Sequence, residues 1–329
     1  MLRFGCLGAA RIAPTALLGP VSKIEGVHVS AVASRDFAKA NAFSNEHHIV
    51  GIETQYEALV QRPDVDIVYN ALPSNRHEDL TILALKAGKA VLCEKPFAMN
   101  AIAAMRMAEV ASETGTLLLE AFHYRFHPAF GRALDVIQAG TIGEVTSFEA
   151  EFSLEIPDRA GELRHTFELG GGALMDLGCY PIHWARSLLA GEPEVLSAAC
   201  VTGRPNIDVR TEAVLQFDNE VRAHIKTDMR PGAARSAWLK VVGSKATLMM
   251  KNPIAPHFGY QITLGRSGLT EVLSEQGPST ETTYDYQLRH FLACLREGEK
   301  PLLPTSDAVA NMTIIDAIYT EAGLPVRSA

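Results

Sequence analysis

Short apolar runs alternate with amphipathic stretches over the first 120 residues of this 329-residue chain. At about 100° per residue the intervening stretches predict helices, one of them capped by Asn100, and the apolar runs predict buried strands. Those runs are Leu2–Leu7, Val27–Ala33, Val65–Leu72, Ala90–Cys93 and Thr116–Glu120. Five short strands that alternate with helices predict an α/β fold of the Rossmann type, with a doubly wound parallel sheet.

The pattern changes after Glu120. A helix is expected through Gln138, and a last apolar-faced helix over Val309–Ala322. Between them, alternating positions predict longer strands, with hairpin turns at Asp218-Asn219 and Gly243-Ser244. These strands are Val145–Glu155, Val195–Val201, Glu212–Asp218, Val221–Met229, Trp238–Gly243 and Ala246–Lys251. We therefore expect an α/β domain over 1–121 and an α+β domain over 122–329 with a mostly antiparallel open sheet.

Composition narrows the class of protein. The net charge is −8, without a basic stripe, which argues against nucleic acid as a partner. No apolar run approaches the length that spans a bilayer, and the strand pattern at Leu2 leaves no room for a signal peptide. The five cysteines are widely spaced without a C-x-x-C, so we expect no disulfide framework, no metal and a reducing cytoplasm. His123 and His127 have a spacing that zinc can use, but no third ligand is evident.

The turn after the first predicted strand has the order of a dinucleotide-binding unit. Gly8-Ala9-Ala10-Arg11-Ile12-Ala13 follows the strand, and Pro14 suits the first turn of a helix. In such units a pyrophosphate binds free N–H groups at the helix N-terminus. Ala10 stands where the second glycine of the fingerprint would be.

The end of the second strand bears on the choice of cofactor. An NAD site places a carboxylate there for the ribose, whereas an NADP site places cationic and hydroxyl donors for the 2′-phosphate. Ser34 and Arg35 favour NADP, and NAD stays possible. Asp36 is expected to cap the next helix, which begins around Phe37.

Two further polar loops follow predicted strands. Ligands of open parallel sheets bind beyond the carboxyl ends of the strands, so Lys95 in Glu94-Lys95-Pro96 is aimed at a ligand. Pro96 restricts Lys95 to extended geometry and makes a cis peptide bond possible. The polar loop Pro73–His77 lies at the same edge. The alternatives are a solvated Glu-Lys turn and plain helix caps at Ser74 and Asn75.

A glycine-rich block in the second half opens another helix. Gly170–Gly172 permit close backbone approach, and Asp176, Tyr180 and His183 fall within one arc of the helix that follows. A carboxylate, a phenol and an imidazole on one helix face are side chains that can act as general acids and bases. The alternative is that Tyr180 is a core aromatic and that Asp176 serves the helix N-terminus.

These motifs, in this order, resemble the Gfo/Idh/MocA family of NAD(P)-dependent oxidoreductases over essentially the whole chain. The matching segments are Gly8–Ala13, Leu72–His77, Glu94-Lys95-Pro96, Glu120-Ala121-Phe122 and Gly170–Tyr180. The tyrosine at position 180 resembles the branch with dihydrodiol dehydrogenase, D-xylose dehydrogenases and sugar ketoreductases. Ala10 departs from the pattern.

The resemblance implies a set of cofactor contacts. The pyrophosphate would lie near the first turn, the 2′-phosphate near the second strand end and the nicotinamide half near the next two loops. Arg164, together with His165, would reach the cofactor or the substrate. The implied cofactor residues are Gly8, Ala10, Arg11, Ile12, Ser34, Arg35, Leu72, Pro73, Asn75, His77, Glu94, Lys95 and Arg164.

The resemblance also implies catalytic roles and an activity. Lys95 and Tyr180 would meet over the carbon that exchanges hydride, with Tyr180 as general acid/base, because a nearby ammonium lowers a phenol pKa. Asp176 would contact the substrate or support the site, and Tyr124 and Arg125 are further pocket candidates. The substrate would be a carbohydrate, a polyol or a dihydrodiol.

The resemblance further implies a homodimer, or a higher homo-oligomer, formed through the C-terminal sheet. Two other functions fit the same resemblance: a non-catalytic NAD(P)-sensing regulator and an NAD-dependent glycosidase. Retention of both Lys95 and Tyr180 counts against the regulator.

Overall fold

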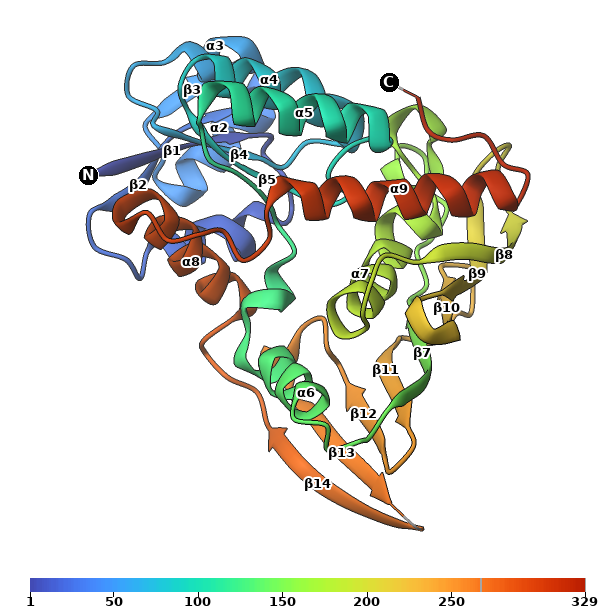
Figure 1. The fold of residues 1–329 in the computed structure, drawn as a ribbon. Coiled ribbons are helices and arrows are strands. Elements are labelled where there is room, and N and C mark those ends of the chain that lie inside the picture. Colours follow the sequence, from blue (N-terminus) through green and yellow to red (C-terminus); the bar gives the residue numbers. More distant parts are fainter. Residues whose placement is uncertain (267, 329) are drawn as a thin grey trace. The chain divides into compact units, whose positions relative to one another are not determined.

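The computed structural model describes residues 1–266 and 268–328, and their contacts group them into two compact units (Figure 1). The first unit contains Met1–Phe122 and Tyr284–Val309, and the second contains His123–Thr283 and Ala310–Ser328. The segment 284–309 thus packs with the N-terminal residues, which nothing in the sequence indicated. The division into a domain over 1–121 and a domain over 122–329 stays a prediction.

The first unit is built on a six-stranded sheet in the order β3-β2-β1-β4-β5-β6, with every neighbouring pair parallel. Its strands are β1 (Leu2–Leu7), β2 (Val27–Ala33), β3 (Gly51–Glu53), β4 (Ile67–Asn70), β5 (Ala90–Cys93) and β6 (Leu118–Glu120). The doubly wound parallel sheet is confirmed. The edge strand β3 was missed because Gly51-Ile52-Glu53 contains only one large apolar side chain and so forms no apolar run, unlike the equally short β6.

Helices cover both faces of this sheet. Successive residues of β1 point to opposite faces: the Phe4 ring contacts Phe291 of α8, whereas a Cβ at Gly5 would meet Leu59 of α3. Helices α4 and α5 lie side by side on the unit (Figure 1). The helices are α1 (Gly19–Val21), which continues a π turn over Pro14–Leu18, α2 (Phe37–His47), α3 (Tyr56–Gln61), α4 (His77–Lys86), α5 (Ala101–Thr114) and α8 (Thr283–Glu297). Asp36 and Asn100 cap α2 and α5, as predicted.

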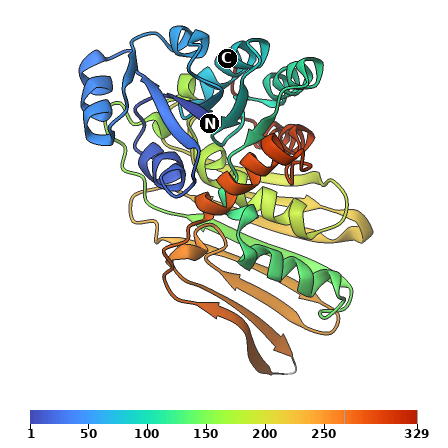
Figure 2. The ribbon, with the colours of Figure 1, turned by 90° about the vertical axis from the view of Figure 1, so that its left-hand side faces the viewer.

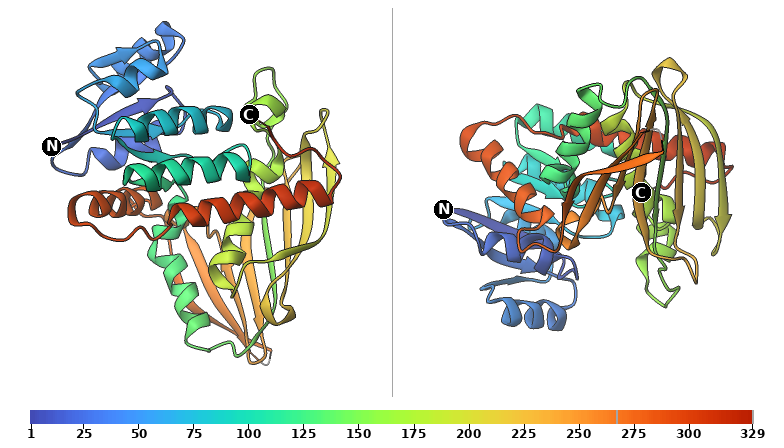
Figure 3. Two further views of the ribbon diagram at one scale, coloured as in Figure 1. Left: turned by 45° about the horizontal axis from the view of Figure 1, so that its top comes forward. Right: turned by 90° about the horizontal axis from the view of Figure 1, so that it is seen from below.

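The second unit holds an eight-stranded sheet in the order β14-β13-β12-β11-β7-β10-β9-β8 (Figures 2 and 3). All neighbours are antiparallel except β7 and β10, so the mostly antiparallel sheet is confirmed. The strands are β7 (Val145–Ser153), β8 (Glu194–Thr202), β9 (Asp208–Gln216), β10 (Arg222–Asp228), β11 (Ser236–Gly243), β12 (Thr247–Lys251), β13 (Tyr260–Arg266) and β14 (Leu269–Gln276). Both predicted hairpin turns are present, at 218–220 and 243–244, whereas β13 and β14 were missed.

One face of this sheet is covered and the other is open. Phe148, Ala150 and Phe152 alternate along β7 toward the covered face and are buried. The covering helices include α6 (Pro128–Gln138) and α7 (Cys179–Leu188), which continues a π turn over Leu174–Gly178 (Figures 1 and 3). Helix α9 (Thr305–Glu321) begins in the first unit and ends in the second. Among the described helices, none combines the length and the apolar character that crossing a bilayer requires.

Candidate active site

The predicted cofactor residues of the first unit gather at one edge of its sheet. Because all six strands are parallel, the segments after β1, β2, β4 and β5 leave the sheet at the same carboxyl edge, where open α/β sheets bind ligands. The loops after β1 and β4 touch: a Cβ at Gly8 would lie 3.0 Å from the Leu72 Cδ2 atom. The parallel topology therefore brings the four segments that follow β1, β2, β4 and β5 to the same edge of the sheet.

The turn after β1 fits a bound pyrophosphate. Gly8 has a φ of +94°, a conformation that side chains rarely adopt, and its N–H donates to the Ala33 carbonyl at 2.9 Å. In the described part of the chain, the N–H groups of Ala10 and Ile12 donate to no other backbone group. Arg11 is exposed beside them. Free amides before a helix are what a phosphate group needs.

The end of β2 presents a cation without a protein partner. Arg35 is exposed, and within the described residues its guanidinium makes no hydrogen bond or ion pair. The Ser34 hydroxyl accepts from the Asp36 N–H at 3.3 Å, while the Asp36 carboxylate caps α2 by accepting from the Lys39 N–H at 3.1 Å. Lys39, in the first turn of α2, is a second exposed cation that the sequence reasoning missed.

The loop after β4 is braced from within. His77 is buried, and its two ring nitrogens lie 2.8 Å from the Leu72 carbonyl and 3.0 Å from the Pro96 carbonyl. Burial lowers the pKa of His77, against the carbonyl contacts that raise it. His77 therefore ties the loops after β4 and β5 together. Next to it the Asn75 Oδ1 atom is buried without a hydrogen-bond partner in the described residues, so it offers an acceptor to a bound molecule.

The loop after β5 holds Glu94 and Lys95 half-buried, and the Lys95–Pro96 peptide bond is cis. The Tyr69 hydroxyl donates to Glu94 Oε1 at 2.7 Å. Burial, together with the Glu94 charge, raises the pKa of Tyr69 well above its usual value, and the same two causes raise the pKa of Tyr284 on α8. The Glu94 carboxylate thus accepts a hydrogen bond from Tyr69, and its charge also acts on Tyr284. Sequence reasoning missed both, although a tyrosine within an otherwise apolar strand was the available signal for Tyr69.

In the second unit the glycine-rich block makes a tight turn. Gly170 ends the short helical turn Phe167–Leu169 with a φ of +81°. A Cβ at Gly171 would stand 2.8 Å from three carbonyl oxygens of the preceding loop, and the Gly172 N–H donates to the Arg164 carbonyl at 2.9 Å. The glycines therefore allow the loop and the start of the next helix to touch through their backbones.

Arg164 joins that loop to the helix. Its Nε donates to Asp176 Oδ2 at 2.8 Å and its Nη1 to Glu162 Oε1 at 3.0 Å. The Asp176 charge is the main cause that raises the pKa of Arg164. The neighbouring His165 is buried, with its Nε2 at 2.9 Å from the Ile156 carbonyl. The predicted cofactor role of Arg164 stays a prediction, and its structural partners are two carboxylates.

Tyr180 lies in an aromatic cluster. Its side chain is 3% exposed, and its ring centroid is 5.6 Å from the Phe152 ring, which is perpendicular to it, and 6.0 Å from the Tyr124 ring. His183 is fully buried and pairs through Nδ1 with the Tyr124 hydroxyl. The predicted helical arc assumed a regular α-helix, but the π turn over Leu174–Gly178 changes the angular spacing before Tyr180. The neighbouring rings pack against the phenol ring of Tyr180, so the hydroxyl is the part of this side chain that can take part in chemistry.

Comparisons with known proteins agree with this architecture. A family model described as "Oxidoreductase family, NAD-binding Rossmann fold" matches residues 2–122, and one described as "GFO/IDH/MocA C-terminal domain" matches residues 130–249. The chain is 30% identical over 321 residues to a D-xylose 1-dehydrogenase (NADP(+)) of Haloferax volcanii, covering 98% of this chain and 97% of that protein. It is 29% identical to a trans-1,2-dihydrobenzene-1,2-diol dehydrogenase of Xenopus tropicalis, over 90% of each chain.

A similar solved structure is that of a 3-ketoreductase from Actinomadura kijaniata in complex with NADP and TDP-benzene. It has a TM-score of 0.89 at 30% identity, over 97% of each chain. The chain therefore belongs to the GFO/IDH/MocA family of oxidoreductases. It is an NAD(P)-dependent oxidoreductase with a Rossmann domain and the C-terminal domain of that family.

Proposed function

We propose that this protein is an NADP(H)-dependent dehydrogenase or reductase that acts on a secondary alcohol or ketone of a sugar, a cyclic polyol or a dihydrodiol. The observation that carries the proposal is the convergence at one sheet edge of the Gly8 turn, the unpaired Arg35 and the Glu94-Lys95-Pro96 loop. The similar proteins named above act on sugars and on a dihydrodiol, in line with this substrate class.

The preference for NADP rests on charge. A 2′-phosphate attracts an exposed cation that has no other partner, and Arg35 meets both conditions within the described residues. An NAD-specific site would place a carboxylate there, yet the Asp36 carboxylate already accepts from the Lys39 N–H. The buried Asn75 acceptor suits a donor group of the nicotinamide half.

The catalytic proposal divides the work between two side chains. A bound nicotinamide supplies the acceptor or donor of the hydride. The Tyr180 hydroxyl exchanges a proton with the substrate oxygen, and its ring is held in place by Phe152 and Tyr124. The Lys95 ammonium stabilises negative charge on that oxygen or on the phenolate. Asp176, which is paired with Arg164, contacts the substrate or orients the site.

Cofactor choice is tested first, by titrating NADP⁺ and NAD⁺ separately against the intrinsic tryptophan fluorescence. We expect tighter binding of NADP⁺, and we expect Arg35→Ala to weaken NADP⁺ while leaving NAD⁺ nearly unchanged. The loss of one charge-assisted contact predicts a change of roughly tenfold or more in Kd. Arg132→Ala, which removes an exposed cation of the second unit, is the control. Equal binding of both dinucleotides by the wild type would overturn the preference.

Turnover is tested with a panel of sugars, polyols and dihydrodiols, by following the absorbance of the reduced nicotinamide. Lys95→Met and Tyr180→Phe should each lower kcat by roughly 10²–10⁴-fold with NADP⁺ binding retained. An active Lys95→Met variant would refute the assignment. Dinucleotide binding without turnover on any panel member would favour the sensing regulator, and tightly copurified NAD that never turns over would favour the glycosidase.

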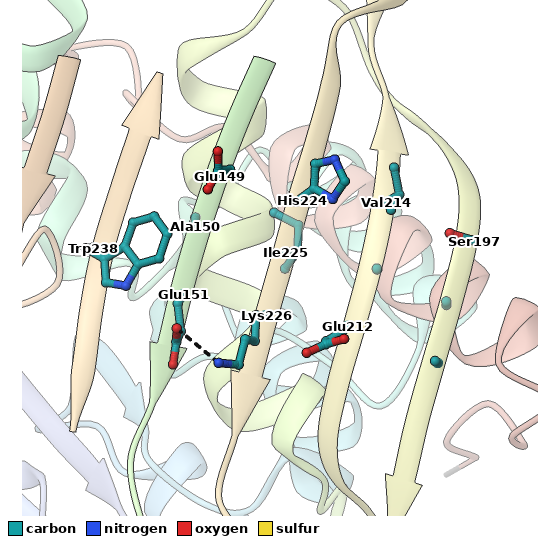
Figure 4. Close-up of a pocket in the computed structure, with 13 residues that line it drawn as sticks. Glu149, Ala150, Glu151, Ser197, Glu212, Val214, His224, Ile225, Lys226 and Trp238 are labelled. Atoms are coloured by element: carbon teal, nitrogen blue, oxygen red, sulfur yellow. Dashed lines mark hydrogen bonds and ion pairs between the residues drawn. The ribbon is translucent and has the colours of Figure 1, made fainter. Parts of the chain in front are cut away.

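The oligomer is proposed from the open face of the eight-stranded sheet. Trp238, Glu151, Lys226 and Glu212 stand in register across four adjacent strands, and they line a hollow of about 520 Å³ (Figure 4). Lys226 donates to Glu151 at 3.3 Å. A row in which charges of opposite sign alternate beside a large aromatic residue can pair with a copy of itself rotated by a two-fold axis. We therefore take its occupant to be a second copy of this chain.

Light scattering after size-exclusion chromatography tests this pairing. We expect a mass of twice one chain or more for the wild type, and a single-chain mass for Trp238→Glu, because that change places a fourth carboxylate among Glu149, Glu151 and Glu212. Lys86→Glu, a charge reversal on α4, is the control and should leave the mass unchanged. A monomeric wild type would contradict the proposal.

A cytoplasmic location is also proposed, because all five cysteines are free thiols.

A further inference from the structure

Asp208, the first residue of β9, is a fully buried carboxylate with four donors. Its Oδ2 accepts from the Leu174 N–H at 2.7 Å and from the Thr211 hydroxyl at 2.9 Å. Its Oδ1 accepts from the Tyr319 hydroxyl at 2.7 Å and from Arg327 at 3.0 Å. Since Leu174 opens the π turn that leads into α7, Asp208 caps the start of the helix that carries Tyr180.

Arg327, in the segment that follows α9, is the cation of this cluster and is 1% exposed. Its Nη2 pairs with Asp208, and its Nε donates to the Gly171 carbonyl at 2.9 Å. The guanidinium carbon lies 4.0 Å from the Tyr319 ring centroid and 4.9 Å from that of Phe167. The planar group thus lies over two rings while its nitrogens bind a carboxylate and a turn carbonyl, a geometry that lysine does not reproduce.

The buried cluster of Asp208, Tyr319 and Arg327 lies directly against the glycine turn. At Gly172, which has a φ of +132°, an added Cβ would meet Asp208 Oδ1 at 2.2 Å and Arg327 Nη2 at 2.6 Å. In the same turn the Gly172 N–H donates to the Arg164 carbonyl, and the Arg164 side chain donates to the Asp176 carboxylate. One buried ion pair is therefore connected to both side chains of this unit for which we propose a role in the reaction.

A buried ion pair of this kind is weak evidence for stability, because an apolar replacement of equal volume is often as stable. Its distinctive property is that its hydrogen bonds have fixed directions. The planar guanidinium of Arg327 and the carboxylate of Asp208, which accepts four hydrogen bonds, together allow one arrangement of the groups that they join. We propose that Arg327 is a positioning residue, which through Asp208 and Gly171 sets the start of the helix that carries Asp176 and Tyr180. The inference rests on the proposed catalytic role of Tyr180.

The test compares Arg327→Lys with the wild type and with Arg186→Lys. Arg327→Lys keeps the charge that Asp208 requires but loses the fork and the bond to Gly171. Arg186→Lys makes the same substitution on α7, where the guanidinium pairs with Glu192. A second variant, Arg327→Met combined with Asp208→Asn, removes both charges, so that no uncompensated ion stays buried if Arg327→Lys fails to fold.

The first readout is amide hydrogen exchange of the full chain without any ligand. In Arg327→Lys the amides of residues 172–176 should exchange about tenfold faster or more, while those of the six-stranded sheet stay as in the wild type. The second readout is kinetic, on any panel substrate that the wild type turns over. We expect kcat to fall by about tenfold to a hundredfold, with KM for NADP⁺ within about twofold, because Asp176 and Tyr180, the groups at the start of this helix, are proposed to act on the substrate.

The two readouts separate failure of this inference from failure of the proposed function. Unchanged exchange and unchanged kcat in folded Arg327→Lys, or equal losses in Arg186→Lys, would overturn the positioning role. A wild type that binds NADP⁺ without turnover would refute the proposed function, while the exchange measurement would still decide whether Arg327 orders the turn. Faster exchange together with a selective loss of kcat is the result that supports the inference.

Discussion

Replacing Gly172 by alanine is the sharpest test of how the glycine block is built. The added Cβ would lie 2.2 Å from Asp208 Oδ1, 2.6 Å from Arg327 Nη2 and 2.7 Å from the Tyr319 hydroxyl, distances that real Cβ atoms do not show. All three neighbours are buried and held by one another, so none can move away without breaking a hydrogen bond. The φ of +132° would be strained for alanine in any surroundings.

The cost has two parts. Backbone strain at such an angle is on the order of 1–3 kcal/mol. Breaking the Asp208–Arg327 pair by displacing one partner is on the order of 3–5 kcal/mol, because a buried charge is left uncompensated. Gly232→Ala isolates the first part, since Gly232 also has a positive φ (+79°) but nothing lies within 4 Å of its Cβ position. We therefore expect Gly172→Ala to lose about 3 kcal/mol more stability than Gly232→Ala.

Thermal unfolding followed by circular dichroism measures the difference. For a unit of this size, about 3 kcal/mol corresponds to a gap of roughly 6–12 °C in Tm between the two variants. Hydrogen exchange at residues 172–176 locates the effect in the turn. A Gly172→Ala variant as stable as Gly232→Ala would mean that the cluster yields without cost, and the reasoning about its rigidity would be refuted.

Two further predictions concern single side chains. Tyr69→Phe removes the hydroxyl that donates to Glu94, so the free energy of unfolding should fall by about 1–3 kcal/mol in chemical denaturation; no change would show that water replaces this bond freely. His127 is buried, and its Nδ1 accepts from the Ala129 N–H at the start of α6. Burial, with a contribution from His257, lowers the pKa of His127 from 6.5 to about 4. The unfolded chain therefore binds a proton before the folded chain does, and stability falls by about 3 kcal/mol as the pH drops from about 6.5 to 4. His127→Asn, which keeps a capping acceptor but does not titrate, should flatten that part of the stability–pH curve, and an unchanged curve would contradict the assignment.

The local sequence pattern was enough to predict the Rossmann unit and the edge of its sheet at which the polar loops lie. The order of strand, turn and helix is written in consecutive residues, and parallel strands bring their carboxyl ends to one edge. Lys95 after a buried strand, Arg35 at the end of β2 and Asp36 as a helix cap followed from position alone. The fold class was therefore readable without any long-range information.

The sheet of the second unit was predicted in kind but not in full. Strands β7, β9, β10 and β12 alternate buried residues with more exposed ones, whereas β14 is exposed at most positions and carries no such signal. The parallel pairing of β7 with β10 joins strands whose residues are about 75 positions apart, and local periodicity does not encode a partner.

Only the tertiary structure decided which polar groups work together. Asp208 meets Arg327 across 119 positions, and the His123 ring meets Thr283 across 160. Tyr69 finds Glu94 only because β4 and β5 are neighbours in the sheet. Periodicity determines which face of an element is buried, because it acts over one or two turns of chain. The pairing of one buried charge with another depends on folding free energy that is shared by the whole unit, and no stretch of sequence states it alone.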